Sequence, residues 1–220
     1  MSFSREAWAR NLPLYEATRD MPFNQEVGNG TLTLARFRHY IVQDAHYLVA
    51  FGQALAAAAA KADHPDHIVQ FAHGAGGAIA VERSLHTEYF RQFGLDSETV
   101  AATPMSPTCH HYASFLTATA LREPLPVVLA SLLPCFWVYR EIGRHIMARA
   151  AVPNPYQAWI DSYGGAEFSD AVDRMIATTD AVSADTSAAT LDAMHRAYRR
   201  AAQLEWMFWD SAYRLEQWAV

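Results

Sequence analysis

The sequence predicts an all-α protein, a bundle of about eight or nine helices within one domain of 220 residues. Alanine, leucine, arginine and glutamate, which favour helices, are abundant throughout the chain. Long alternating runs of β-branched residues, which indicate strands, are missing. Glycines and prolines divide the chain into segments of helical length. We therefore expect no linker long enough to separate domains and no internal repeat.

Caps and breakers define the helices of the first half. Ser4 begins a helix that ends before Pro22, and a glycine-rich turn leads to a long helix from about Thr33. Pro65 suits the first turn of the third helix, and Gly94 ends it. The full set of expected helices covers residues 4–20, 33–62, 65–93, 107–121, 124–150, 155–163, 166–182 and 187–217.

Prolines and glycines also divide the second half. Pro107 and Pro124 begin two helices, and Pro134 lies inside the second of these. An interior proline removes one backbone hydrogen bond and bends the helix axis. A Gly164–Gly165 pair separates the short helix expected at residues 155–163 from the last two helices of the chain.

Charge and composition argue against nucleic acid and membranes as partners. The net charge is −6, and Lys61 is the single lysine among 17 basic residues, so no concentrated cationic face is expected. The longest strongly apolar run, residues 127–139, is too short to span a bilayer. The N-terminal residues lack the apolar stretch of a secretory signal, so we expect a cytoplasmic protein. Two cysteines are too few for a disulfide framework.

Three segments place reactive side chains among apolar residues. Asp44 shares a helical face with Tyr47, and Cys135 lies one turn before Tyr139. Glu205 stands in the apolar sequence LEWMFWDSAY, where a carboxyl group is suited to proton transfer. Structural roles remain open for all three segments, because buried carboxylates also make structural hydrogen bonds and a buried cysteine is more often an inert core residue.

Metal binding is an alternative, since the chain has ten histidines. Glu82 and His86 are four residues apart, as are Glu141 and His145. Helical di-iron proteins instead carry Glu and His three residues apart. The sequence contains no Cys-x-x-Cys or His-Glu-x-x-His pattern. We therefore expect neither a metal nor another cofactor.

Five segments together resemble the TenA family, also called thiaminase II, over essentially the whole chain. They occur in the family's order: YIVQDAHYL, HHYASF, LLPCFWVYREIG, YQAWIDSYGGAEF and LEWMFWDSAY. The resemblance implies a haem-oxygenase-like helical bundle without haem, in a single domain over residues 1–220. It also implies a homotetramer, or at least a dimer.

The resemblance further implies a reaction of thiamine salvage. TenA-like proteins hydrolyse 4-amino-5-aminomethyl-2-methylpyrimidine to the 5-hydroxymethyl compound and ammonia, and many also cleave thiamine. Cys135 matches the cysteine that defines one branch of the family and would be its nucleophile, Glu205 would move protons, and Asp44 would bind the polar edge of the pyrimidine. The aromatic substrate-binding residues implied are Tyr47, Tyr112, Tyr139, Tyr163 and Phe208.

Two other functions stay open from the sequence. A metal-dependent oxidase on the same scaffold would use the Glu/His pairs, since a fold does not by itself determine chemistry. A non-catalytic pyrimidine-binding protein is the second. The sequence does not rank thiamine against its degradation products as the substrate.

Overall fold

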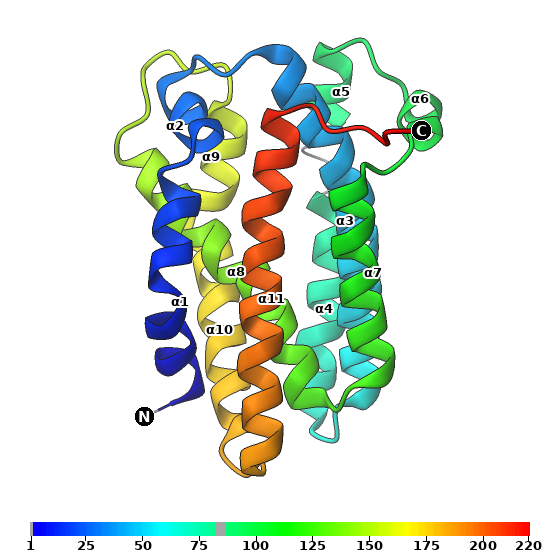
Figure 1. Ribbon diagram of the computed structural model, residues 1–220, viewed down its shortest axis with the longest axis vertical. Coiled ribbons are helices and arrows are strands. Elements are labelled where there is room, and N and C mark those ends of the chain that lie inside the picture. Colours follow the sequence, from blue (N-terminus) through cyan, green and yellow to red (C-terminus); the bar gives the residue numbers. More distant parts are fainter. Residues whose placement is uncertain (1, 82–86) are drawn as a thin grey trace. The chain divides into compact units, whose positions relative to one another are not determined.

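The computed structural model describes residues 2–81 and 87–220 (Figure 1). Eleven helices and no strand lie in these two ranges. The helices are α1 (Phe3–Arg19), α2 (Pro22–Asn29), α3 (Leu34–Lys61), α4 (Pro65–Val81), α5 (Thr87–Gln92), α6 (Ser97–Ala102), α7 (Pro107–Arg122), α8 (Leu125–Met147), α9 (Gln157–Gly164), α10 (Ala166–Ser183) and α11 (Ala188–Tyr213). The predicted all-α class is confirmed.

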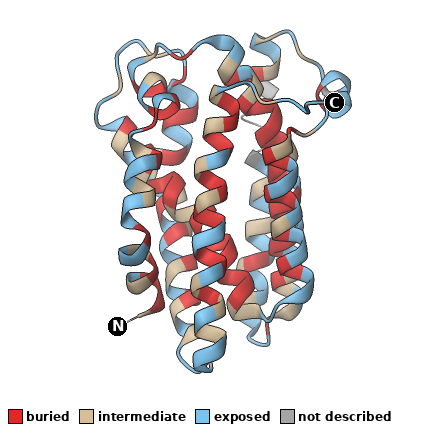
Figure 2. Cartoon of the chain, viewed as in Figure 1, coloured by how far each residue is buried: buried red, intermediate tan, exposed pale blue. Residues whose placement is uncertain are grey.

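The chain forms two compact units. The first contains residues Met1–Leu32 and Arg122–Trp206, and the second contains Thr33–Leu121 and Met207–Val220. Helix α11 therefore supplies residues to both units. Within the helices, buried residues follow stripes along one face, as Figure 2 shows, which is the pattern of amphipathic helices that cover a core.

Helix α8 is the core helix of the first unit. It contacts α1, α2, α9 and α10. Every residue from Val127 to Cys135 is buried, which explains why the sequence there is apolar except for Ser131. The Ser131 hydroxyl donates to the Val128 carbonyl at 2.7 Å. By length and composition α8 could span a membrane, but 72% of its most apolar stretch is buried inside the protein. That burial is typical of a core helix.

Polar contacts tie the other helices of this unit together. The backbone N–H and the hydroxyl of Ser4 both donate to the Asp180 carboxylate at 2.7 Å, which joins α1 to α10. The Asn154 side chain donates to the carbonyls of Val27 and Gly28, at 2.9 and 3.0 Å. The end of α2 is thereby fixed against the loop before α9.

In the second unit, α3 and α4 pack along each other. Gly52 on α3 faces the Ala75 carbonyl of α4, and an added Cβ at Gly52 would lie 3.4 Å from that oxygen. Gln43 on α3 fixes the loop before α7, because its amide nitrogen donates to the Pro104 carbonyl and its oxygen accepts from the Ser106 N–H. These contacts position α7 beside α3.

Two short helices were not expected from the sequence. Helix α2 has Pro22 in its first turn and Gly30 as a left-handed C-cap with φ +70°. The proline and the glycine that were expected to interrupt helical structure therefore begin and end a helix of eight residues. Helix α6 begins after Asp96, whose carboxylate accepts from the Thr99 N–H at 2.7 Å. The last helix ends at Tyr213, four residues before the expected end.

Candidate functional site

Four of the eight predicted site residues lie in the second unit. Asp44 and Tyr47 are one turn apart on α3, Tyr112 is on α7, and Phe208 is near the end of α11. All four are buried, with exposed fractions of 2% or less. The sequence prediction that Asp44 lies within an apolar stripe is confirmed.

Tyr47 is the centre of an aromatic cluster. Its ring centroid lies 4.7 Å from that of Tyr112 and 5.5 Å from that of Phe208. Phe51, one turn further along α3, is stacked at 5.8 Å, and Tyr40 meets Phe208 edge-on at 6.0 Å. The offset and edge-on contacts in this cluster are the arrangements that aromatic rings prefer.

Cys109, at the start of α7, is buried beside Asp44. Burial, with a further contribution from the negative charge of Asp44, raises the pKa of the Cys109 thiol to about 12. Its S–H donates to the backbone carbonyl of Gln43 at 3.3 Å. Cys109 therefore remains a protonated thiol at neutral pH and is a poor nucleophile.

The other four predicted site residues lie in the first unit. Cys135 and Tyr139 are on α8, Tyr163 is on α9 and Glu205 is on α11. Glu205 is 1% exposed, and Cys135 is 8% exposed. The Tyr139 and Tyr163 rings are in contact, with centroids 4.9 Å apart and planes tilted by 47°. Cys135 therefore shares its face of α8 with a tyrosine pair assembled from two helices.

Gly143 fixes the distance between α8 and α9. A Cβ at this position would lie 2.7 Å from the backbone carbon of Tyr163 and 2.8 Å from its carbonyl oxygen. Those separations are too short for any side chain, so glycine alone permits this approach. Gly143 is not among the site residues predicted from the sequence. Its spacing of four residues from Tyr139, inside an apolar helix, is the signal that could have identified it.

The alternative metal ligands do not form a cluster where the structure describes them. Glu82 and His86 lie outside the described residues. Glu141 accepts from Arg140 at 2.9 Å, and His145 lies 2.6 Å from an Arg149 nitrogen. Across residues 2–81 and 87–220, no group of three or more histidine, cysteine or acidic side chains could hold a metal ion.

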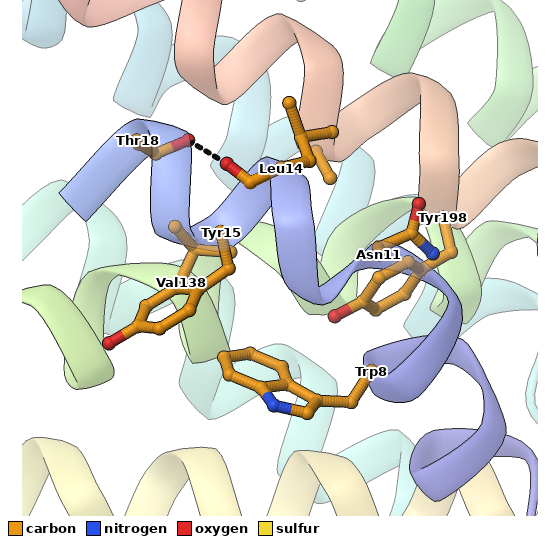
Figure 3. A pocket seen from close by; sticks show the side chains of 8 residues that line it. Trp8, Asn11, Leu14, Tyr15, Thr18, Val138 and Tyr198 are labelled. Atoms are coloured by element: carbon orange, nitrogen blue, oxygen red, sulfur yellow. Dashed lines mark hydrogen bonds between the residues drawn. The ribbon is translucent and has the colours of Figure 1, made fainter. Parts of the chain in front are cut away.

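A small cavity in the first unit lies between α1, α8 and α11 and is shown in Figure 3. Its volume is about 10 Å³, which is room for about one water molecule and not for a pyrimidine. Trp8 and Tyr15 line it with ring centroids 4.8 Å apart. Burial raises the pKa of Tyr198, whose ring also lines the cavity, so that hydroxyl stays protonated at neutral pH.

Comparison with known proteins identifies the family. The sequence pattern that defines the TENA/THI-4/PQQC family matches residues 10–215. The chain belongs to this family. It is 31% identical to the aminopyrimidine aminohydrolase of Bacillus subtilis, over 100% of this chain and 93% of that protein. It is 32% identical to the thiamine biosynthesis multifunctional protein ThiED of Corynebacterium efficiens, over 96% of this chain and 28% of that protein.

Solved structures agree with this TenA assignment. A TenA homologue from P. horikoshii has a TM-score of 0.88 and 26% identity, covering 97% of this chain and 99% of its own. A Shewanella denitrificans domain with a heme oxygenase-like fold has a TM-score of 0.74 at 13% identity, covering 96% of this chain and 92% of its own, and this match shows the fold alone. The predicted haem-oxygenase-like class is confirmed. The chain is an enzyme of the thiaminase II type.

Proposed function

We propose that this TenA protein hydrolyses 4-amino-5-aminomethyl-2-methylpyrimidine to the 5-hydroxymethyl pyrimidine and ammonia, with Cys135 as the nucleophile. The observation that carries the proposal is the buried Cys135 thiol on α8, one turn from a tyrosine that contacts Tyr163. The full-length similarity to a Bacillus subtilis aminopyrimidine aminohydrolase supports the reaction class, and the similarity to ThiED supports a place in thiamine metabolism.

The proposed reaction passes through a covalent adduct with Cys135, in four bond-changing steps. The Cys135 thiolate adds to the ring carbon next to the carbon that bears the aminomethyl group, and the ring becomes an electron-rich enamine. The enamine then expels the amine from the methylene carbon, and the amine leaves with a proton as ammonia. Water then adds its oxygen to the methylene carbon and gives up one proton, which replaces the proton that left with the amine. The carbon–sulfur bond breaks, and its electron pair leaves with the Cys135 thiolate as the aromatic ring is restored. Covalent catalysis of this kind replaces one difficult substitution by easier steps.

The remaining residues are proposed to bind the ring and to move protons. Glu205, buried on α11, would exchange protons with the ring nitrogen and the 4-amino group. Asp44 would accept hydrogen bonds from the polar edge of the heterocycle. Tyr139 and Tyr163 would orient the catalytic pair. The walls against the ring would come from the aromatic cluster of Tyr47, Tyr112 and Phe208.

The wider setting is also part of the proposal. We expect the whole chain to act as one domain, in the cytoplasm, as a homotetramer that needs no cofactor. The small-molecule partner would be an aminopyrimidine or thiamine.

Product analysis tests the proposed reaction directly. Purified protein is incubated with the aminomethyl pyrimidine and, separately, with thiamine, and the products are separated by liquid chromatography with mass detection. We expect the hydroxymethyl pyrimidine and ammonia from the first substrate, with a higher kcat/KM than for thiamine, since the smaller leaving group places fewer demands on the pocket. An equal or higher kcat/KM for thiamine would contradict the assigned substrate, and no turnover of either would contradict the function.

A further inference from the structure

Residues 214–220, which follow α11, contact the start of α7 and are called here the C-terminal strap (Figure 1). The Thr108 N–H, in the first turn of α7, donates to a Glu216 carboxylate oxygen at 2.8 Å. The Trp218 indole N–H donates to the Met105 carbonyl, also at 2.8 Å. The C-terminal strap is therefore bonded to the chain on both sides of the point where α7 begins.

Glu216 completes the hydrogen bonding of the first turn of α7. The first N–H groups of a helix have no acceptor within the helix. Pro107 has no N–H, and the Cys109 N–H donates to the Ser106 hydroxyl oxygen at 3.3 Å. Thr108 lies between these two residues and is buried, so its N–H depends on the Glu216 carboxylate for an acceptor. A negative charge suits this position, because the N-terminal end of a helix is the positive end of its dipole.

The end of α11 has a turn that directs the chain toward α7. The Leu215 N–H donates to the Ala212 carbonyl at 3.2 Å, and the Glu216 N–H donates to the Ser211 carbonyl at 2.9 Å. These two bonds form a Schellman motif, whose left-handed position is usually a glycine. Here it is Leu215, with φ +54°. A leucine in this conformation costs free energy, so the contacts of the C-terminal strap with α7 have to help hold the turn.

The C-terminal strap joins two helices that carry rings of the aromatic cluster. Phe208 is on α11, about two turns before Glu216, and Tyr112 is on α7, one turn after Thr108. Both rings contact the Tyr47 ring on α3, with centroids 5.5 and 4.7 Å from it. The bond between Glu216 and Thr108 therefore ties together the two helices whose rings lie against Tyr47.

We propose that Glu216 is a positioning residue for the aminohydrolase reaction, because it holds the start of α7 so that Tyr112 stays against Tyr47. The proposal rests on the proposed function, in which these two rings are part of the wall that binds the pyrimidine. Without the carboxylate, the buried Thr108 N–H loses its acceptor, and the first turn of α7 shifts until that N–H finds another acceptor or water.

Loss of the Glu216 carboxylate should weaken binding more than it slows chemistry. A shifted first turn of α7 lowers the fraction of the protein in which the ring wall is formed, and the apparent affinity for substrate falls with that fraction. Cys135 and Glu205, which carry the proposed chemistry, are on neither α7 nor the C-terminal strap. We therefore expect KM to rise and kcat to stay nearly constant.

Steady-state kinetics with the aminomethyl pyrimidine on the full chain measure this division. Glu216→Ala should raise KM by about tenfold, the size of a lost charge-assisted hydrogen bond, with kcat within about twofold of the wild type. Glu216→Gln keeps an oxygen that accepts from the Thr108 N–H, so its KM should return to within about threefold of the wild type. The matched control is Glu98→Ala, which removes an exposed carboxylate from α6 in the same unit and should leave both constants within about twofold.

A double-mutant cycle tests whether Glu216 acts through Tyr112. In a Tyr112→Leu background the ring that Glu216 positions is gone, so the further change Glu216→Ala should raise KM by less than about twofold. Hydrogen exchange gives a readout that does not depend on turnover. The backbone amides of residues 108–112 should exchange about tenfold faster in Glu216→Ala than in the wild type, and Glu98→Ala should leave them unchanged.

The wild type and the variants separate two kinds of failure. A wild type without turnover would overturn the proposed function, and the positioning role with it. An active wild type with an unchanged KM in Glu216→Ala, or a loss confined to kcat, would overturn the positioning role alone. The same holds for a Glu216→Gln variant as impaired as Glu216→Ala, an equal KM increase in Glu98→Ala, a full tenfold effect in the Tyr112→Leu background, or unchanged exchange at residues 108–112. Circular dichroism of each variant checks that the fold is kept.

Discussion

Adding one methyl group at Gly143 is a direct test of the contact between α8 and α9. An alanine Cβ would lie 2.7 Å from the Tyr163 backbone carbon, whereas ordinary contacts begin at 3.4 Å. The Tyr163 backbone would have to retreat by about 0.7 Å to restore normal van der Waals contact. Because the obstacle is backbone and not the flexible end of a side chain, helix α9 as a whole must shift.

Two opposing terms determine the size of the effect on stability. Overpacking of this kind costs about 1–3 kcal/mol. Replacing a helical glycine by alanine stabilises the folded state by about 0.5–1 kcal/mol, since alanine loses less conformational entropy on folding. Because the obstacle is backbone, the overpacking cost falls at the upper end of its range, about 3 kcal/mol. We therefore expect Gly143→Ala to lower the free energy of unfolding by about 2 kcal/mol, measured by reversible urea denaturation. Turnover of the aminomethyl pyrimidine should fall by about tenfold to a hundredfold, because Tyr163 is displaced by a fraction of an ångström.

Gly76→Ala is the matched control. Gly76 lies in the interior of α4, and an added Cβ there meets no atom within 4 Å. The same chemical change should raise the free energy of unfolding by about 0.5–1 kcal/mol and leave turnover unchanged. If Gly143→Ala is as stable as the wild type, or is stabilised as Gly76→Ala should be, the close approach of the two helices is not a constraint on the fold.

Three further predictions concern pH, proton transfer and assembly. Burial lowers the pKa of His39 below its ordinary 6.5, so the unfolded chain binds a proton at this side chain before the folded chain does as the pH falls. The free energy of unfolding, measured by urea titration, should therefore decrease below about pH 7, and it should decrease less steeply in His39→Gln. Equal slopes against pH in the two proteins would refute this. Glu205→Gln keeps the shape of the side chain but removes proton exchange, so kcat should fall by about 10² to 10⁴-fold, and a near-native kcat would remove Glu205 from the mechanism. Light scattering should give the mass of four chains of 24.5 kDa each, and a single-chain mass at micromolar concentration would contradict the homotetramer.

The long helices could be predicted because their signals are local. The apolar stripe of α3 and the prolines that flank α7 and α8 predict the extents of these helices within a few residues. Helix α2 was missed because a proline that begins a helix and a proline that follows one look alike in a sequence. Helix α6 was missed because its N-cap, Asp96, stands in a stretch with many turn-forming residues.

The site could be predicted only in part, because its contacts join distant segments. The one-turn spacing of Cys135 and Tyr139 follows from helical periodicity. The contact of Tyr139 with Tyr163 depends on the path of the chain between α8 and α9, which no local pattern encodes. Periodicity also treats Cys109 and Cys135 alike. The raised pKa of Cys109, caused by burial and the charge of Asp44, is a property of the folded chain.

The most direct measurement of the proposed chemistry compares two substitutions at the two buried thiols. Cys135→Ser and Cys109→Ser are each assayed for conversion of the aminomethyl pyrimidine, with circular dichroism to confirm folding. Serine has nearly the same volume as cysteine but a far higher pKa, so Cys135→Ser should lose turnover by orders of magnitude while still binding the pyrimidine. Cys109→Ser should keep turnover within about twofold, since that thiol is protonated and bonded to the Gln43 carbonyl. Near-native turnover by folded Cys135→Ser would contradict covalent catalysis. Water activated by the carboxylates of Asp44 and Glu205 would then have to be the nucleophile.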